Sequence, residues 1–347
     1  MYDASEIGLD WQGSLQTLSE VPSKSCSYLS IDGKIKTHTG KARCRLTIED
    51  TLVDGTFGKL NWAKRSVGTE DDSQDVLVKK PVEQIQGMQE AIIQWMCYNS
   101  LKKYKLSQHC PKVYDLFTYK NNYWFTMEPV YSAPIFEVYL QSLPYWKQSH
   151  PSNGIAILKI LAQIAMCCSI LESDIGFNHR DLKPDNILIK HTDIKSHSVI
   201  LGDLQISVSP SPTAVLVDFG FACLGPGTRP WIESGGQILS PLDSCPKVGR
   251  DLFIIFVFLL WREDVRASLT PEHLQFFKES LHLTKDRWSK MMSMTRNPKE
   301  WIYMLITDKE FHCPALDSQV WLSTCSTAFP EVVSIKVQLS SKIVVKS

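Results

Sequence analysis

The stretch "FNHRDLKPDNIL", residues 177–188, decides the fold, because it packs histidine, arginine, lysine, aspartate and asparagine into a dozen positions. An apolar residue or pair stands at each end of it. Polar groups at this density are costly to bury unless each of them finds a partner. The segment is therefore expected to be a site, and the rest of the chain should supply its partners.

Three side chains within this stretch suit one kind of chemistry. Asn186 carries a neutral oxygen that can ligate a hard cation such as Mg²⁺. Lys183 can neutralise a phosphate as negative charge builds up on it. Asp181 can take a proton from a group that is held beside it. Together they predict transfer of a phosphoryl group to a hydroxyl, a reaction in which the protein supplies mostly positioning and electrostatics.

The words "HRDLKPDN" fulfil every fixed position of the protein kinase catalytic loop, His-Arg-Asp-Leu-x-x-x-Asn, so the chain resembles a protein kinase. Downstream, "AVLVDFGFA" is a hydrophobic strand followed by an Asp-Phe-Gly sequence that begins at Asp218. The resemblance implies that Asp218 and Asn186 are the ligands of Mg²⁺. It also implies that Asp181 is the catalytic base and that Lys183 stabilises the transferred charge.

Upstream, "LVDGTFGKL" (residues 52–60) resembles the Gly-rich loop that covers the nucleotide phosphates. Gly55 and Gly58 stand at the second and third glycine positions, and Phe57 stands at the tip of the loop. Val53 occupies the first position, where a β-branched residue resists positive φ, so we expect a less tight turn. The resemblance implies that all four residues border bound ATP.

The stretch "VLVK" (residues 76–79) stands where the family has its Val-Ala-Ile-Lys strand. The resemblance implies that Lys79 contacts the α- and β-phosphates and pairs with a helix glutamate. The neighbouring Lys80 should point to the opposite face, because side chains alternate along a strand. We expect Glu90, within a predicted helix over residues 82–104, to be the partner. Glu83, two turns earlier on roughly the same face, is the alternative.

Two further segments resemble parts of the same family. "YWFTMEPVY" (residues 123–131) is similar to the hinge segment, with Met127 at the gatekeeper position and Glu128 at the start of the hinge. The resemblance implies that both border the adenine. "VGRDLFIIFVFLL" (residues 248–260) resembles the buried helix that braces the catalytic loop. Asp251 stands at its start, where a helix N-terminus favours an acid.

The resemblance covers about residues 43–262 and implies an α+β, bilobal fold. A β-rich lobe is expected over residues 41–130 and a mainly helical lobe over residues 131–347. Residues 1–40, rich in Ser and Thr, are expected to be an N-terminal extension of uncertain order. Residues 311–347 show little pattern from which an element can be predicted.

The implied function is that of a Ser/Thr protein kinase that uses ATP and Mg²⁺, because tyrosine kinases usually lack a lysine at the place of Lys183. Proteins are the expected substrates, and autophosphorylation is a further expectation. One alternative is a catalytically weak or inactive pseudokinase that acts as an ATP-binding scaffold, which Val53 and the lack of an Ala-Pro-Glu sequence after Asp218 favour. Another is a small-molecule kinase of the aminoglycoside or choline type, which usually lacks Arg180 and Lys183 in this arrangement. The small, irregular form is also similar to kinases of large DNA viruses.

The chain departs from the family in two places that bear on the site. A gap of 31 residues separates Asn186 from Asp218, where the family has a short hairpin, so we predict an extended hairpin or loop. No Ala-Pro-Glu follows Asp218, and residues 221–250 are expected to hold the activation segment. Arg180 is expected to receive a phosphate from that segment. The candidate acceptors are Thr228, Ser234 and Ser240.

The composition of the chain limits the kinds of partner and the cell compartment that the sequence supports. Lys plus Arg equals Asp plus Glu at 37 each in 347 residues, so net charge gives no case for nucleic acid or an anionic membrane. The N-terminus has no secretory pattern, and the most apolar run, residues 252–261, is too short to span a bilayer. The ten cysteines form no Cys-x-x-Cys pair and are expected to be reduced thiols. We therefore expect an intracellular, cytoplasmic protein, in the host cytoplasm if it is viral.

Overall fold

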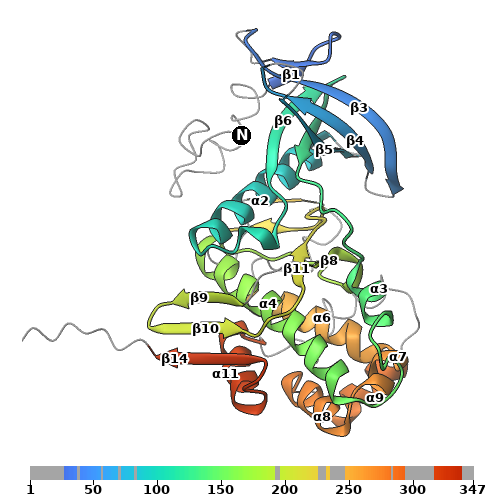
Figure 1. Ribbon diagram of the computed structural model, residues 1–347, viewed down its shortest axis with the longest axis vertical. Helices are drawn as coiled ribbons and strands as arrows, with labels where there is room; N and C mark the ends of the chain where they lie inside the picture. Colours follow the sequence, from blue (N-terminus) through green and yellow to red (C-terminus); the bar gives the residue numbers. More distant parts are fainter. Residues whose placement is uncertain are drawn as a thin grey trace, which may run out of the picture.

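Strands dominate one end of the molecule and helices the other, as Figure 1 shows. The computed structural model describes residues 27–36, 40–55, 58–68, 72–81, 84–191, 196–225, 232–234, 247–282, 284–293 and 316–337. The predicted α+β class is therefore confirmed. The strand-rich end comes from the N-terminal part of the described chain, and the helical end comes from the C-terminal part.

The strand-rich end is a closed barrel in the order β1-β2-β3-β4-β5-β7-β6. Its strands are β1 (Ser27–Leu29), β2 (Lys34–Lys36), β3 (Ala42–Gly55), β4 (Gly58–Ser66), β5 (Ser73–Pro81), β6 (Val113–Tyr119) and β7 (Asn122–Met127). All neighbours pair antiparallel except β1 and β6, which pair in parallel and close the barrel. Closure leaves the sheet without the free edges that invite pairing with other chains. A separate apolar core of buried residues, among them Ile35, Phe117 and Trp124, fills the barrel.

The start of the barrel departs from the sequence prediction. Residues 1–40 were expected to form an extension outside the lobe, yet β1 and β2 are barrel strands. Each has three residues, which is too short for an alternating pattern to be read from the sequence. The buried side chain of Ile35 fixes β2 to the barrel core. Within the described residues, sheet structure therefore begins at Ser27.

Helix α2 (Gln84–Lys103) packs against the barrel strands on one side and against α4 (Pro151–Ile175) on the other. It begins and ends close to the predicted bounds, residues 82–104. The helix is long enough to carry Glu90 under the barrel and Ser100 against the helical end, where the Ser100 hydroxyl donates to Asp174 (2.7 Å). This helix is therefore the main link between the two ends of the molecule.

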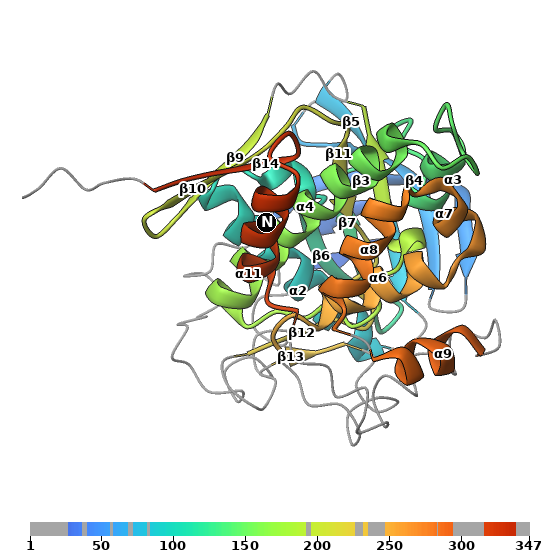
Figure 2. The same ribbon diagram turned by 90° about the horizontal axis from the view of Figure 1, so that it is seen from below.

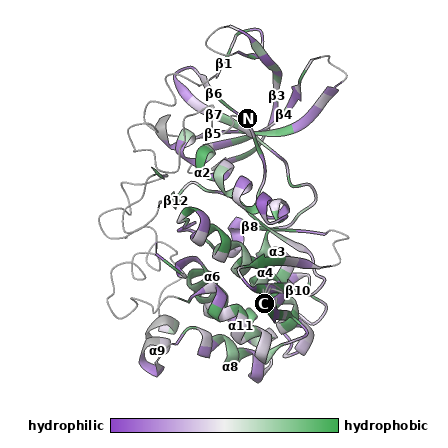
Figure 3. Ribbon diagram, turned by 90° about the vertical axis from the view of Figure 1, so that its left-hand side faces the viewer, coloured by the Kyte–Doolittle hydropathy of each residue, from purple (hydrophilic) through white to green (hydrophobic). Residues whose placement is uncertain are grey.

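Helix α4 is the centre of the helical end (Figure 3). Its N-terminus is capped by the ring of His150, which accepts the N–H of Ser152 (3.2 Å), and Pro151 occupies the first helical position. Its C-terminus ends at Gly176 in the left-handed conformation, φ 56°. Among the described helices it alone is long and apolar enough to cross a membrane, but 83% of its most apolar window is buried inside the fold. It is thus accounted for as a core helix.

The remaining described α-helices also lie in the helical end, where α6 and α11 pack against α4. They are α3 (Phe136–Gln141), α6 (Arg250–Trp261), α7 (Glu263–Ser268), α8 (Pro271–Ser280), α9 (Lys285–Ser293) and α11 (Ser318–Ala328). Helix α6 is the apolar run noted in the sequence, and nearly all of its residues are buried. Helix α11 was not predicted. Its start is capped by Asp317, which accepts the N–H groups of Gln319 and Val320 (2.9 Å each).

The long segment between Asn186 and Asp218 forms two hairpins. β8 (Ile187–Lys190) pairs with β11 (Thr213–Leu216), and between them β9 (His197–Leu201) pairs with β10 (Leu204–Val208). The predicted extended hairpin is therefore confirmed. β14 (Val333–Val337), from the weakly patterned tail, pairs with the other side of β10, and the three strands form a sheet beside α4 and α11 (Figure 2).

Among the described residues, the cysteines agree with the prediction except at Cys223. Six are free and buried: Cys44, Cys97, Cys110, Cys167, Cys168 and Cys325. Cys223 is disulfide-bonded, and its partner lies outside the described residues. The expectation that all ten are reduced thiols is therefore wrong for Cys223.

Glu172 joins the end of α4 to the start of α6. Its carboxylate accepts the N–H of Gly249, the residue before α6 (2.9 Å). Burial raises the pKa of Glu172 to about 8, and the nearby charges of Asp251 and Asp317 act in the same direction. The folded protein therefore holds the proton of Glu172 more tightly than the unfolded chain does.

A Glu172→Gln substitution should remove a pH-dependent loss of stability. A carboxyl whose pKa is raised by folding destabilises the fold as pH rises from its ordinary value of 4.5 toward about 8. Glutamine keeps an acceptor for Gly249 and has no proton to lose. The advantage of the variant in free energy of unfolding should grow by up to about 4 kcal/mol between pH 4.5 and about 8.5.

Chemical denaturation at a series of pH values measures this difference. Glu272→Gln, at an exposed position of α8, is the matched control and should show no such growth. A difference between Glu172→Gln and the wild type that is independent of pH would contradict the assignment.

Candidate functional site

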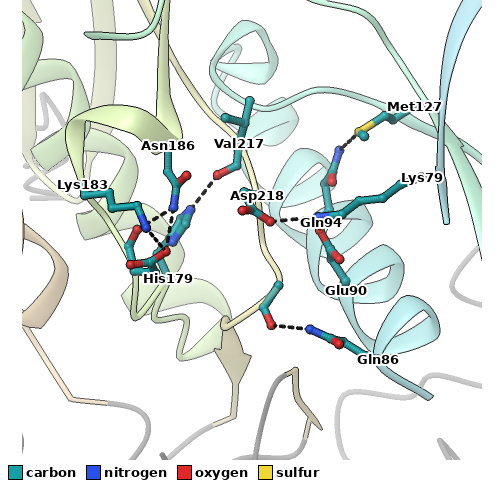
Figure 4. Close-up of polar contacts among 12 residues, drawn as sticks. Lys79, Gln86, Glu90, Gln94, Met127, His179, Lys183, Asn186, Val217 and Asp218 are labelled. Carbon is teal, nitrogen blue, oxygen red and sulfur yellow. Dashed lines mark hydrogen bonds and ion pairs between the residues drawn. The ribbon is translucent and has the colours of Figure 1, made fainter. Parts of the chain in front are cut away.

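The catalytic-loop motif folds so that its three predicted residues, Asp181, Lys183 and Asn186, lie together. Figure 4 shows two of them, Lys183 and Asn186. The ammonium group of Lys183 donates to Asp181 Oδ2 (2.8 Å). The side-chain amide of Asn186 donates to the backbone oxygen of Asp181 (2.8 Å) and to its Oδ2 (3.0 Å). The other carboxylate oxygen, Oδ1, is buried and has no hydrogen-bond partner within the described residues. A buried acceptor without a partner is costly, so this oxygen marks the place where an outside donor fits.

The loop is held from below by a buried carboxylate. Asp251, in the first turn of α6, accepts the backbone N–H groups of His179 (2.6 Å) and Arg180 (2.9 Å). Arg180 has a positive φ of 68°, a conformation that a non-glycine residue keeps only when its surroundings over-determine it. The two hydrogen bonds to Asp251 do so, which explains why so apolar a helix begins with an acid.

The segment that carries Asp218 runs beside this loop. Nε2 of the His179 ring donates to the carbonyl oxygen of Val217 (3.0 Å). The N–H of Val217 donates to the carbonyl oxygen of Asn186 (3.1 Å). The next residue, Asp218, has a positive φ of 61°. The turn in the backbone at Asp218 is therefore fixed by hydrogen bonds on its N-terminal side.

Asp218 also meets the barrel and α2. The ammonium group of Lys79, from β5, forms ion pairs with Glu90 of α2 and with Asp218 Oδ1 (2.8 Å). Glu90 and Lys79 are largely buried, whereas the side chain of Asp218 is 38% exposed. Figure 4 shows Asp218 between Lys79 and Glu90 on one side and Lys183 and Asn186 on the other. The structure thus brings together the residues predicted for phosphate, metal and base.

The structure answers in part whether Glu90 or Glu83 pairs with Lys79. Lys79 pairs with Glu90, and Glu83 lies outside the described residues. The sequence reading missed Gln86, which is one helical turn before Glu90 and donates to the carbonyl of Gly220 (3.2 Å). The i, i+4 spacing from Glu90 was the available signal, since it places both side chains on one face of α2.

Two groups at this junction, Lys79 and Asp218, are held in their ionised forms. Burial acts to lower the pKa of Lys79, but the charges of Glu90 and Asp218 outweigh it and raise that pKa above its usual value. Burial acts to raise the pKa of Asp218, yet Lys79, with help from His179 and Lys183, holds it below the ordinary range. Lys79 is therefore an ammonium and Asp218 a carboxylate at neutral pH, the forms that bind phosphate and a hard cation.

The donor set suits magnesium. Asp218 Oδ2 and the side-chain oxygen of Asn186 make no hydrogen bond within the described residues, so both are open to a ligand. In the part of the chain that the structure describes, no cluster of three or more His, Cys, Asp or Glu forms a metal cage. Mg²⁺ usually binds through one or two protein oxygens together with water and phosphates, rather than in a protein cage. Asp218 and Asn186 therefore fit this ion.

The Gly-rich segment is a β-hairpin, and the expected less tight turn falls on residues 56 and 57, which lie outside the described residues. Val53 lies in extended backbone within β3, opposite Leu60 of β4, and its side chain is 52% exposed. Gly55 pairs with Gly58 at the end of the hairpin, and Phe57 lies outside the described residues. Gly58 has φ 139°, and a Cβ there would meet the backbone of Lys80 and Pro81 in β5. Glycine at this position lets β4 and β5 approach closely.

Met127 and Glu128 end β7 and begin the connection to the helical end. Met127 is half-buried, and its sulfur accepts from the side chain of Gln94 in α2 (3.6 Å). The backbone N–H of Glu128 donates to the carbonyl of Lys112 (2.8 Å). Because the N–H of Glu128 already donates to Lys112, a nucleotide base bound here would have to form hydrogen bonds with other backbone groups of the connection.

Arg180 already has a charged partner in the structure. Its guanidinium forms an ion pair with Glu233 (2.5 Å), which the sequence reading did not select. Of the three candidate phosphate acceptors, Ser234 is fully buried, and Thr228 and Ser240 lie outside the described residues. No local signal marked Glu233, because its pairing depends on a chain reversal in a segment without periodicity.

Comparison with known proteins relates this chain to protein kinases. Residues 46–215 match the family model described as protein tyrosine and serine/threonine kinase. The chain is also similar to the dual specificity protein kinase YAK1 homolog of Arabidopsis thaliana, with 27% identity over 188 residues. That stretch is 53% of this chain and 17% of the relative's length, so the chain spans far less than two thirds of that protein.

A Gly58→Ala substitution should destabilise the barrel more than Gly68→Ala does. Both glycines have positive φ, 139° and 93°, so alanine carries a backbone cost at either position. At Gly58 the new Cβ would also lie 2.9 Å from the Cα of Pro81, whereas nothing stands within 4 Å at Gly68. The additional loss in free energy of unfolding should be about 1–3 kcal/mol, measured by chemical denaturation. Equal losses for the two variants would contradict the close approach of β4 and β5.

Proposed function

Since the chain carries a domain of the protein kinase superfamily, we propose that it transfers the γ-phosphoryl group of ATP to serine or threonine hydroxyls of proteins. The observation that carries the proposal is the meeting at Asp218 of two sets of residues. Lys79 and Glu90 come from the barrel and α2, and Asp181, Lys183 and Asn186 come from the catalytic loop. A scaffold has no chemical need for this complete set.

The barrel and the helical end act in this proposal as two lobes that hold ATP between them. Lys79 binds phosphate oxygens while Glu90 holds its ammonium group in place. In this proposal the hairpin segment that contains Val53, Gly55, Phe57 and Gly58 covers the phosphates. Met127 and the backbone after Glu128 border the adenine. We propose that the two lobes divide near residue 130, with β1 and β2 belonging to the first lobe.

Asp218 and Asn186 would hold Mg²⁺, which would draw charge from the phosphates as it develops. Asp181 orients the substrate hydroxyl through Oδ1, its oxygen without a partner, and accepts the proton as the new O–P bond forms. The bond between the β and γ phosphates breaks, and ADP leaves. Lys183, already beside Asp181, stabilises the negative charge on the transferred group.

Two features favour particular substrates. Lys183 supports the Ser/Thr class, as the resemblance implies. The similar plant protein is named a dual specificity kinase, which favours a chain that also accepts tyrosine. We propose serine and threonine as the main acceptors, because the lysine is part of the site itself and the relative is distant.

An Asp181→Asn variant should lose phosphoryl transfer and keep nucleotide binding. Asparagine preserves the size of the side chain but accepts a proton poorly, so kcat should fall by about 100- to 10,000-fold. The assay uses radiolabelled ATP, Mg²⁺ and generic protein substrates, and phosphoamino-acid analysis identifies the acceptor. The rise in melting temperature on adding Mg-ATP measures binding in both proteins.

Asp185→Asn, which changes the next aspartate of the loop, is the matched control and should retain activity, since the side chain of Asp185 is exposed. A wild type that binds Mg-ATP tightly without transfer to itself or to any protein would support the scaffold alternative. Phosphotyrosine as the only product would overturn the Ser/Thr assignment.

A further inference from the structure

We propose that Glu233 is a positioning residue that supplies a built-in counter-charge to Arg180, so that the site is organised without phosphorylation of the segment after Asp218. The inference rests on the proposed kinase function and concerns its regulation. It departs from the expectation, stated from the sequence, that Arg180 receives a phosphate. Glu233 acts through Arg180 and the catalytic loop and does not itself touch the reacting groups.

The ion pair is buried. The side chain of Arg180 is 0% exposed and that of Glu233 is 16% exposed, and Nη1 of Arg180 lies 2.5 Å from Oε1 of Glu233. Arginine does not lose its proton in proteins, so its charge has to be balanced where it is buried. Removing one partner of such a pair leaves an uncompensated charge inside the protein. Glu233 therefore supplies the negative charge that the buried guanidinium of Arg180 requires.

The backbone brings Glu233 to this place through two neighbouring strands. β12 (Cys223–Leu224) pairs with β13 (Ile232–Glu233), with Cys223 opposite Glu233. On the other side of β12, Cys223 exchanges hydrogen bonds with Asn178 of the catalytic loop (2.9 and 3.0 Å). Asn178, Cys223 and Glu233 thus form one row across three chain segments. Arg180 stands two residues after Asn178, so its side chain can return along the row to Glu233.

The next residue tightens the same arrangement. The backbone N–H of Ser234 donates to the carbonyl of Ala222 (2.9 Å), and Ser234 is fully buried. A kinase acting in trans has no access to the Ser234 hydroxyl in this arrangement. Ser234 is therefore part of the ordered junction instead of a switch within it.

The pair is connected to the chemistry through the backbone of Arg180. Its N–H is held by Asp251 and its side chain by Glu233, and Asp181 follows directly. A phosphate on the segment would bring about −1.5 to −2 charges to the same guanidinium. A carboxylate built into β13 brings one charge permanently, which is enough to balance one arginine. The arrangement of Asp181 then depends on Glu233 and not on a modification.

The first test uses the wild-type chain. The protein is treated with a phosphatase, shown by mass spectrometry to carry no phosphate on residues 221–250, and assayed with Mg-ATP and a generic protein substrate. We expect unchanged kcat, with the segment still unmodified when the assay ends. Loss of activity that returns when the segment is phosphorylated again would overturn the proposal.

The second test separates charge from shape. Glu233→Gln keeps the size of the side chain and removes the charge, whereas Glu233→Asp keeps the charge and shortens the side chain. We expect kcat to fall on the order of 10- to 100-fold in Glu233→Gln, with KM for ATP little changed, and to fall less in Glu233→Asp. A merely structural role predicts the opposite order, and that order would overturn the proposal.

Two controls make the outcome specific. Glu272→Gln removes an exposed carboxylate from α8 and should retain wild-type kcat. A rise in melting temperature with Mg-ATP shows that each variant is folded. A wild type without transfer would contradict the proposed function itself, whereas an active wild type with an equally active Glu233→Gln variant would contradict only this inference.

Discussion

One ammonium group, Nζ of Lys79, holds together three parts of the chain that are far apart in sequence. Its partners Glu90 and Asp218 are 11 and 139 residues away, in α2 and in the segment after β11. Burying these charges costs desolvation free energy, and a well-packed apolar replacement is often as stable. The contact is therefore better understood as a constraint on geometry than as a source of stability. It ties the position of the barrel to that of the catalytic loop.

The geometry depends equally on backbone strain that the fold supports. Arg180 and Asp218 both have positive φ. Each is held by hydrogen bonds from another element: Asp251 fixes the backbone at Arg180, and the contacts of Val217 with His179 and Asn186 fix the turn before Asp218. Residues in such conformations cluster where function requires an exact side-chain direction. The large apolar cores of α4 and α6 supply the rigidity against which this strain is maintained.

The parts of the site that could be predicted from the sequence are those in which chemistry and spacing are local. The order Asp181, Lys183, Asn186 and the lysine at the end of an apolar strand are of this kind, and so is the hairpin before Asp218. The residues that were missed depend on contacts distant in sequence. β1 closes the barrel against β6, and Glu233 reaches Arg180 only after the chain reverses between β12 and β13. A strand of three residues is too short to show a periodic apolar pattern, and a single glutamate cannot show one.

The C-terminal segment shows how the insertion and the tail depend on each other. The hairpin of β9 and β10 would be marginal alone, since an isolated two-stranded hairpin is barely stable in water. β14 gives it a third strand, and α11, five residues earlier, anchors that strand to the helical core. Trp321 of α11 is buried against Phe256 of α6 and Phe276 of α8, and its ring N–H donates to Ser280 (3.2 Å). The pairing of β8 with β11 closes the base of the insertion before Asp218 is reached. The extra segment is therefore stabilised by its own contacts, and the pairing of β8 with β11 joins its two ends beside the site.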